Sequence, residues 1–358
     1  MQAPEAPADP HIAFTNRTTF VFAGPSDSHR EITSLAQGAE LEIIERNRVG
    51  NWVRVQRTSD EGAVTLDGWV LSGYLALNED LRFSDVPVNT DVPESDRIKA
   101  TSLVEAQLYE VPVLSTVSPA MAEVYLRGQW LGNQSRVVTK IGDSVAANEF
   151  FLTPMSHPDY ELGAYDFLEE TINFFGPSLA EPSVAARIGM TTYVIFDPFW
   201  ADKDLCRANE TPLECEFRLK KPSIALIVFG ANDVRHMTDA EFDEQMRLIV
   251  EESLAAGVIP VLSTFSNDPE APLWWQSINF NLRLADIAAE YEVPLINLWA
   301  AARILPDYGL DQDQVHLKNS GFRYIKFTRG NEADYGVTLQ NLLSIRMLDE
   351  IRRTLNMG

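Results

Sequence analysis

Residues 223–264 read SIALIVFGANDVRHMTDAEFDEQMRLIVEESLAAGVIPVLST, and this stretch decides the fold of the C-terminal part of the chain. It contains two runs rich in β-branched residues, 224–230 and 258–264, which are typical of strands buried on both faces of a parallel sheet. Between them, Thr238 and Glu241 have the spacing of a helix capping box, and the apolar residues that follow recur on one helical stripe. The stretch therefore predicts a strand–helix–strand unit, as expected in an α/β fold.

The same alternation continues on both sides of this stretch. Further strands are predicted at 136–141, 191–196 and 293–299, and further helices at 281–291 and 337–355. Strands and helices in series predict a three-layer α/β/α sandwich around a parallel sheet. Ligands of such sheets bind at the C-terminal ends of the strands, so the chemistry is expected there.

The N-terminal part has a different sequence pattern. The segments 41–45, 52–56 and 68–75 combine mixed alternation with β-branched and aromatic residues, and turn signals separate them. Residues 12–77 therefore predict a small all-β barrel. Residues 1–11 read as a tether, 78–99 as an acidic, proline-containing linker, and 100–358 as the second domain.

Composition limits the classes of function. The chain has 358 residues, enough for about two domains, and its net charge is −23. Such a surface repels phosphate backbones and anionic lipid heads, so we expect no nucleic-acid partner. No apolar run is long enough for a transmembrane segment.

The first residues bear on location. The opening MQAPEAPADP is no signal peptide and resembles the tether that follows a removed one. This favours an extracellular or cell-envelope protein over a cytosolic one with a frayed N-terminus.

The chain has two cysteines, Cys206 and Cys215. Their spacing allows a local disulfide without requiring one, and a pair of reduced, buried thiols is the alternative. No histidine lies between them, so a zinc site is not expected. In an extracytoplasmic protein, we predict the disulfide.

Two short segments follow predicted strands and carry polar groups suited to catalysis. Ser144, in Gly142-Asp143-Ser144, is placed as a nucleophile would be, and Asn232, in Gly230-Ala231-Asn232-Asp233, can donate its amide to an oxyanion. Each segment alone reads equally well as a turn.

A serine nucleophile needs a base, and two of the five histidines qualify. His236 and His316 each have an aspartate three residues upstream, Asp233 and Asp313, which could orient the imidazole. The spacing does not choose between them. If Asn232 faces the crevice, Asp233 is expected to be used in the turn.

Taken together, these segments resemble the SGNH or GDSL-type hydrolase superfamily over residues 136–355. The matching residues are Gly142–Ser144, Gly230–Asp233, Asp313, His316 and Gly321. The resemblance implies a flavodoxin-like sandwich and selects His316 over His236. It also implies that no metal or organic cofactor is used.

The resemblance also implies roles for single residues. Ser144 corresponds to the nucleophile, His316 to the general base and acid, and Asp313 to the orienting carboxylate. Asn232 and the Ser144 backbone N–H correspond to two oxyanion donors. The third donor is a glycine N–H, for which we choose Gly189 over Gly163 and Gly176.

Residues 12–77 resemble the bacterial SH3-like domain. The segment FVFAGPSDS, an Asn-Trp-Val at 51–53 and a Gly-Trp-Val at 68–70 follow one another in the family's order. In that family such domains often accompany secreted or cell-wall enzymes, so a cell-wall ligand is a candidate partner. Trp52 and Trp69 are either a binding face or scaffold, and we favour scaffold.

The combined expectation is an extracytoplasmic serine esterase that acts on O-acyl esters, with acetylated carbohydrate first and short-chain lipid esters second. Trp274 and Trp275, expected in a loop after 258–264, are candidates for a substrate-facing wall, with simple packing as the alternative. Two other functions stay open: a catalytically silent wall- or glycan-binding protein, and an acyltransferase with the same triad.

Overall fold

The computed structural model divides the chain into two compact units, Met1–Leu103 and Val104–Gly358. The predicted tether lies outside the described residues except for His11, and most of the predicted linker lies outside them as well. The structure describes residues 11–25, 29–46, 52–59, 61–71, 74–76, 81, 86–87, 89 and 104–357.

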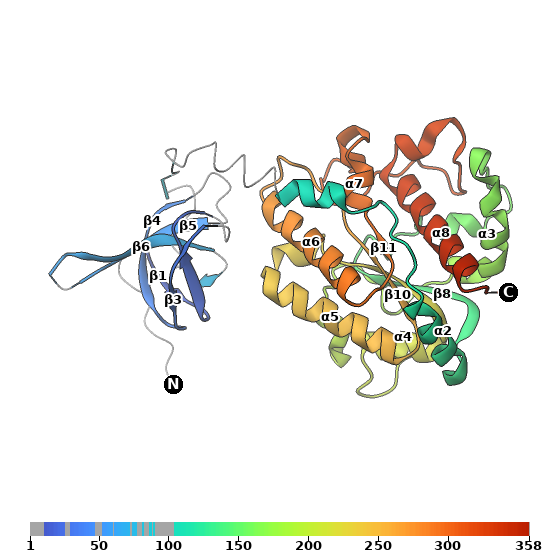
Figure 1. The fold of residues 1–358 in the computed structure, drawn as a ribbon, viewed down its shortest axis with the longest axis horizontal. Helices are drawn as coiled ribbons and strands as arrows, with labels where there is room; N and C mark the ends of the chain where they lie inside the picture. Colours follow the sequence, from blue (N-terminus) through green and yellow to red (C-terminus); the bar gives the residue numbers. More distant parts are fainter. Residues whose placement is uncertain are drawn as a thin grey trace. The chain divides into compact units, whose positions relative to one another are not determined.

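The N-terminal unit is an antiparallel sheet (Figure 1). Its strands pair in the order β3-β2-β6-β5-β4-β1-β7, and apolar side chains such as Val21, Leu41 and Val53 fill its core. Trp52 and Trp69 are only 7% and 5% exposed, which agrees with a scaffold role. The strands are β1 (Ile12–Thr15), β2 (Thr19–Phe22), β3 (Glu31–Leu35), β4 (Glu40–Arg46), β5 (Trp52–Thr58), β6 (Val64–Leu71) and β7 (Leu75–Ala76).

The C-terminal unit is built on a parallel sheet, as predicted. Its strands pair in the order β11-β10-β9-β8, and every residue of the two central strands is buried. This complete burial explains why those segments are continuously apolar. The strands are β8 (Gln134–Gly142), β9 (Pro222–Val228), β10 (Ile259–Ser263) and β11 (Leu295–Ile296).

The strand predicted at 191–196 is wrong. These residues form a turn followed by the 3-10 helix η6 (Val194–Phe196). The backbone N–H of Thr192 donates to the side chain of Asp233, so a carboxylate takes the bond that a neighbouring strand would have accepted. Slightly upstream, Ala186 forms an isolated parallel bridge with Gly142 at the end of β8.

Helices flank this sheet in two groups (Figure 1). One group pairs α5 with α6, where the rings of Phe242 and Phe280 stack at 4.1 Å, and the other pairs α3 with α8, where Thr171 donates to Asp349. The predicted capping box of Thr238 and Glu241 is present at the start of α5. The helices are α2 (Ala120–Leu131), α3 (Glu169–Phe175), α4 (Pro212–Lys220), α5 (Asp239–Ala255), α6 (Trp274–Glu290), α7 (Leu298–Ala302) and α8 (Gly336–Thr354), and residues 104–110 are also helical.

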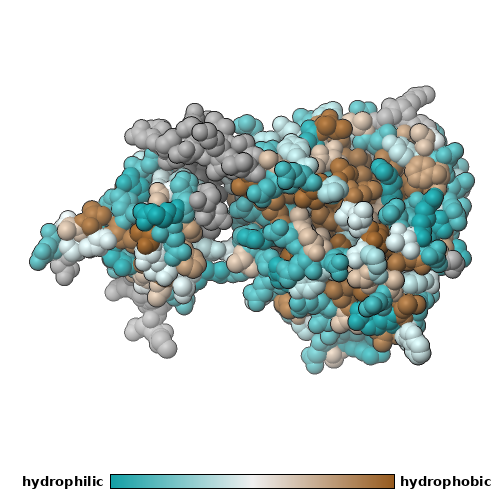
Figure 2. Space-filling view, in the orientation of Figure 1, coloured by the Kyte–Doolittle hydropathy of each residue, from teal (hydrophilic) through white to brown (hydrophobic). Residues whose placement is uncertain are grey.

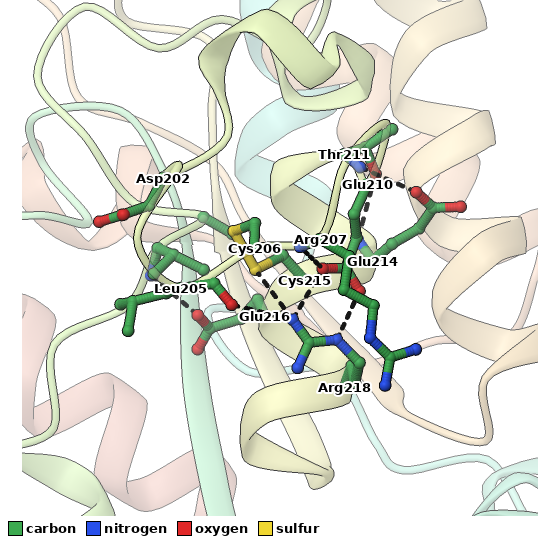
Figure 3. Close-up of a disulfide and its surroundings, with 12 residues drawn as sticks. Asp202, Leu205, Cys206, Arg207, Glu210, Thr211, Glu214, Cys215, Glu216 and Arg218 are labelled. Carbon is green, nitrogen blue, oxygen red and sulfur yellow. Dashed lines mark hydrogen bonds and ion pairs between the residues drawn. A yellow bond between two sulfur atoms is a disulfide. The ribbon is translucent and has the colours of Figure 1, made fainter.

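Cys206 and Cys215 form a disulfide that joins the preceding loop to α4, which contains Cys215 (Figure 3). Beside it, Arg218 donates two hydrogen bonds to Glu210, which lower the pKa of that carboxyl to about 2. Glu216, which directly follows Cys215, is buried and accepts a hydrogen bond from the N–H of Val184. Helix α4 thereby links the disulfide to the segment that precedes Gly189.

The surface mixes hydrophilic and hydrophobic residues on the face shown in Figure 2. Among the large apolar side chains that reach solvent are Ile188, Tyr193 and Phe199, which all precede α4. Within the residues that the structure describes, no helix combines the length and apolar character needed to cross a membrane.

Candidate active site

Ser144 lies in the turn that follows β8. Gly142 precedes it with φ +152°, and a Cβ at this glycine would stand 2.0 Å from the carbonyl oxygen of Val228 on β9. Only glycine allows this approach, which brings the turn against the end of the neighbouring strand. The Ser144 hydroxyl therefore lies at the C-terminal end of the sheet, where an α/β fold places its ligands.

The hydroxyl of Ser144 meets His316. Its Oγ lies 2.8 Å from Nε2, and Nδ1 of the same imidazole lies 2.6 Å from Oδ2 of Asp313. The three side chains form one hydrogen-bonded series from hydroxyl to carboxylate. Such a series can take the proton of an attacking hydroxyl and stabilise the imidazolium that results.

The loop that carries His316 also holds Asp313 in place. Oδ1 of Asp313 accepts the backbone N–H groups of Val315 and His316, which leaves Oδ2 facing the imidazole. Partial burial raises the pKa of Asp313, but the hydrogen bonds from His316 and Val315 outweigh it and lower the pKa overall. The carboxyl group is therefore ionised at neutral pH, as an orienting group must be.

Asn232 and Gly189 come together beside the nucleophile turn. Nδ2 of Asn232 donates to the carbonyl oxygen of Met190 at 3.1 Å, which ties the turn after β9 to the residue next to Gly189. An amide nitrogen carries two N–H groups, so one stays for another acceptor. In the described part of the chain, the backbone N–H groups of Ser144 and Gly189 have no hydrogen-bond acceptor.

The two other glycines considered for the third donor lie elsewhere. Gly163 and Gly176 begin the 3-10 helices η4 (Gly163–Leu168) and η5 (Gly176–Leu179). No hydrogen bond among the described residues joins either of them to Ser144 or Asn232. The bond between Asn232 and Met190 therefore favours Gly189.

Two buried aspartates lie beneath these turns. Asp143 is 1% exposed and accepts the N–H of Val145, and its carboxyl group also faces the backbone N–H of Asn232. Burial, with a smaller contribution from the nearby charge of Asp233, raises the pKa of Asp143 to about 7. Sequence reasoning assigned Asp143 no role, although its position within Gly-Asp-Ser was a signal.

His236 is not part of the hydrogen-bonded series. Its upstream partner Asp233 accepts the N–H of Gly230 within the turn, as expected, and also the N–H of Thr192 from a second loop. The imidazole instead lines a cavity of about 480 Å³. The cavity is lined by Gly189, Thr191, Tyr193, Val194, His236, Met237 and Glu241. Of these residues, the sequence had indicated only Gly189 as part of the site and His236 as an alternative base.

The proposed aromatic wall needs correction. Trp274 and Trp275 begin α6 instead of lying in a loop, and Trp274 is only 4% exposed. It packs with Leu108 and Trp299 in a separate apolar cluster, while Trp275 is half-buried at its edge. For Trp274 the packing alternative therefore holds, and it cannot form an exposed wall.

Comparisons with known proteins identify the N-terminal unit. Residues 17–76 match the bacterial SH3 domain, which confirms that part of the sequence prediction. A search of curated proteins found no match.

Solved structures resemble part of the chain. A lipase/acylhydrolase from Enterococcus faecalis is 23% identical, with 61% of this chain and 96% of that chain covered and a TM-score of 0.39. Axe2, an acetylxylan esterase from Geobacillus stearothermophilus, is 16% identical over 62% of this chain and 95% of its own, with a TM-score of 0.39. A putative lipolytic protein of the G-D-S-L family from Desulfitobacterium hafniense is 17% identical over 59% and 99%, with a TM-score of 0.35.

Proposed function

We propose that the chain is a serine esterase that cleaves O-acyl esters through an acyl-enzyme on Ser144. The observation that carries the proposal is the unbroken hydrogen-bonded series from Ser144 through His316 to Asp313. A buried turn would explain Ser144 alone, but it would not explain why a histidine 172 residues away meets its hydroxyl.

The chemistry follows from this geometry. Nε2 of His316 removes the proton of Ser144 as Oγ forms a bond to the ester carbonyl carbon, and the π electrons of the carbonyl move to its oxygen. As this tetrahedral species collapses, the bond to the alcohol oxygen breaks, and the alcohol leaves with the proton from His316. In the second half of the reaction, water loses a proton to His316 and attacks the acyl carbon. The bond from this carbon to Oγ then breaks, the acid is released, and Oγ recovers the proton from His316.

The negative oxygen of the tetrahedral species needs donors. The backbone N–H groups of Ser144 and Gly189 and the amide of Asn232 are the proposed set, since the contact between Asn232 and Met190 holds two of the three segments together. Loss of one such donor typically costs about 10²- to 10³-fold in kcat.

The preferred substrates are acetyl or other short acyl groups on carbohydrate, with short-chain lipid esters second. This order rests on analogy with other enzymes that carry a bacterial SH3 domain, which also favours an extracytoplasmic location and a cell-wall ligand for that domain.

The first experiment measures release of p-nitrophenol from acetyl to octanoyl esters and of acetate from acetylated glycans. We expect the wild type to be active and Ser144→Ala to lose at least about 10³-fold in kcat. Equal inactivity of both proteins on every ester would contradict the proposal and favour a binding protein. Product analysis with added sugar acceptors separates hydrolysis from acyl transfer, because both share the acyl-enzyme.

A further inference from the structure

Asp233, the aspartate three residues before His236, joins two separate loops. The residue is completely buried, and its Oδ1 accepts both the N–H and the hydroxyl of Thr192, at 2.7 and 2.8 Å. Its Oδ2 accepts the N–H of Gly230 at 3.0 Å. A single carboxyl group thus fastens the segment around Thr192 to the turn after β9.

Each of the two loops carries a proposed oxyanion donor. Gly189 lies three residues before Thr192, and Asn232 directly precedes Asp233. The bond from Asn232 to the carbonyl of Met190 connects the same two loops closer to the donors. The separation of the two donors therefore depends on the bonds that Asp233 makes.

We propose that Asp233 is a positioning residue that fixes the Gly189 N–H relative to the Asn232 amide, so that both point at the same oxygen of the transition state. The inference rests on the proposed esterase function and assigns a role that the hydrogen-bonded series does not include. Neither Asp233 nor Thr192 touches the substrate in this account, and both act through the donors.

The burial of Asp233 agrees with a role in holding the two loops together. Burying a carboxyl group is costly unless its oxygens accept hydrogen bonds, and here three donors from two loops satisfy it. Burial raises the pKa of Asp233, and the hydrogen bonds from Thr192 and Gly230 act against that rise. The carboxyl group and the two loops thus hold one another rigidly in place. Such rigidity matters because a misplacement of about 1 Å can cost about 10²-fold in rate.

Thr192 offers the sharpest test, because two substitutions separate its shape from its hydroxyl. Thr192→Val keeps the shape and the backbone N–H bond but removes the hydroxyl bond to Asp233, whereas Thr192→Ser keeps the hydroxyl and removes a methyl group. We expect Thr192→Val to lower kcat on p-nitrophenyl acetate about 3- to 10-fold with KM within twofold, and Thr192→Ser to stay near the wild type. We expect Asp233→Asn to lower kcat about 10- to 100-fold with a similarly small change in KM.

A matched pair in the same unit controls for the loss of a buried hydrogen bond. Thr171 donates to Asp349 at 2.5 Å, and both residues are buried between α3 and α8. Thr171→Val should lower the melting temperature but leave kcat within twofold of the wild type.

The outcomes are distinguishable. A Thr192→Val variant whose kcat matches those of Thr192→Ser and Thr171→Val would overturn the positioning role, even in an active enzyme. If Asp233→Asn does not fold, the two variants of Thr192 still decide the question. An inactive wild type would instead overturn the proposed function, and the positioning role would fall with it.

Discussion

The hydroxyl of Ser144 and Nε2 of His316 lie 2.8 Å apart, although 172 positions separate the two residues in the chain. The contact is made by two turns, one directly after β8 and one in the loop before α8. The second turn holds both Asp313 and His316. Substitution of Asp313 therefore tests the effect of orienting the imidazole, and substitution of His316 tests the effect of the imidazole itself.

Replacement of Asp313 by asparagine should lower kcat by about 10²- to 10⁴-fold, because the amide no longer stabilises the imidazolium or fixes its tautomer. The measurement is the steady-state rate on p-nitrophenyl acetate, with KM determined in parallel. Asp311→Asn, a change of an exposed aspartate in the same loop, serves as the control. Equal rates for the two variants would exclude Asp313 from the reaction.

The two Asp-x-x-His motifs predict opposite outcomes when each histidine is replaced. His316→Ala should reduce kcat by at least about 10³-fold. His236→Ala should leave kcat within about threefold, with any larger effect confined to KM, because this residue lines the cavity beside Gly189. The reverse result would assign the general base to His236.

The stability of the protein should depend on the ionisation of Asp143. Its pKa is about 7 in the folded state against an ordinary value of 3.8, so between these values the folded state holds a proton that the unfolded chain has lost. Unfolding then releases a proton, and the free energy of unfolding falls as the pH rises from about 4 to about 7.

Asp143→Asn should remove this part of the pH dependence. The variant should gain stability relative to the wild type between pH 5 and pH 8, as measured by urea unfolding at each pH. Asp166→Asn, at an exposed position, should keep the wild-type slope. A slope for Asp143→Asn equal to that of the wild type would show that Asp143 does not titrate in this range.

The disulfide should contribute to stability more than to catalysis. Cys206 and Cys215 are nine positions apart, and closing a loop of this length stabilises a protein by about 2–3 kcal/mol. The double variant Cys206→Ser/Cys215→Ser should show this loss in denaturant unfolding, and wild type under reducing conditions should match it. We expect kcat within about threefold of the wild-type value, since neither cysteine takes part in the hydrogen-bonded series of Ser144, His316 and Asp313. Unchanged stability would contradict the prediction.

On the proposed function, the unit Val104–Gly358 should hydrolyse small esters without the SH3 domain. The residues of the candidate site all belong to the unit Val104–Gly358. A protein that contains only this unit should therefore retain kcat and KM for p-nitrophenyl acetate within twofold. A large loss of kcat in a folded fragment would mean that the N-terminal unit contributes to the site.

Local sequence signals predicted much of the fold. The capping box of Thr238 fixed the start of α5, and continuous apolar runs predicted β9 and β10 because both strands are fully buried. An equivalent capping box at Thr211 begins α4, so the start of this helix also has a local signal in the sequence. By contrast, α6 begins after Leu273, which offers no side-chain cap, so its first turn had no local signal.

Other features depend on contacts that no local pattern contains. The β-branched run at 191–196 is not a strand, because Thr192 is bound by a carboxylate from the turn after β9. The spacing of Asp-x-x-His could not distinguish His236 from His316, since both motifs satisfy it equally. The two aspartates differ in what they contact in the folded protein: Asp233 accepts a hydrogen bond from Thr192, and Asp313 faces the imidazole of His316.

About half of each side chain in the pair of Asp313 and His316 reaches solvent, at 51% and 46%. The proposed acid–base group thus lies at the rim of the molecule and not at the bottom of a tunnel. On the proposed function, an ester in the middle of a long polymer can approach Ser144 sideways, without a free chain end having to thread inward. Such an enzyme would deacylate a polysaccharide at interior positions along its length.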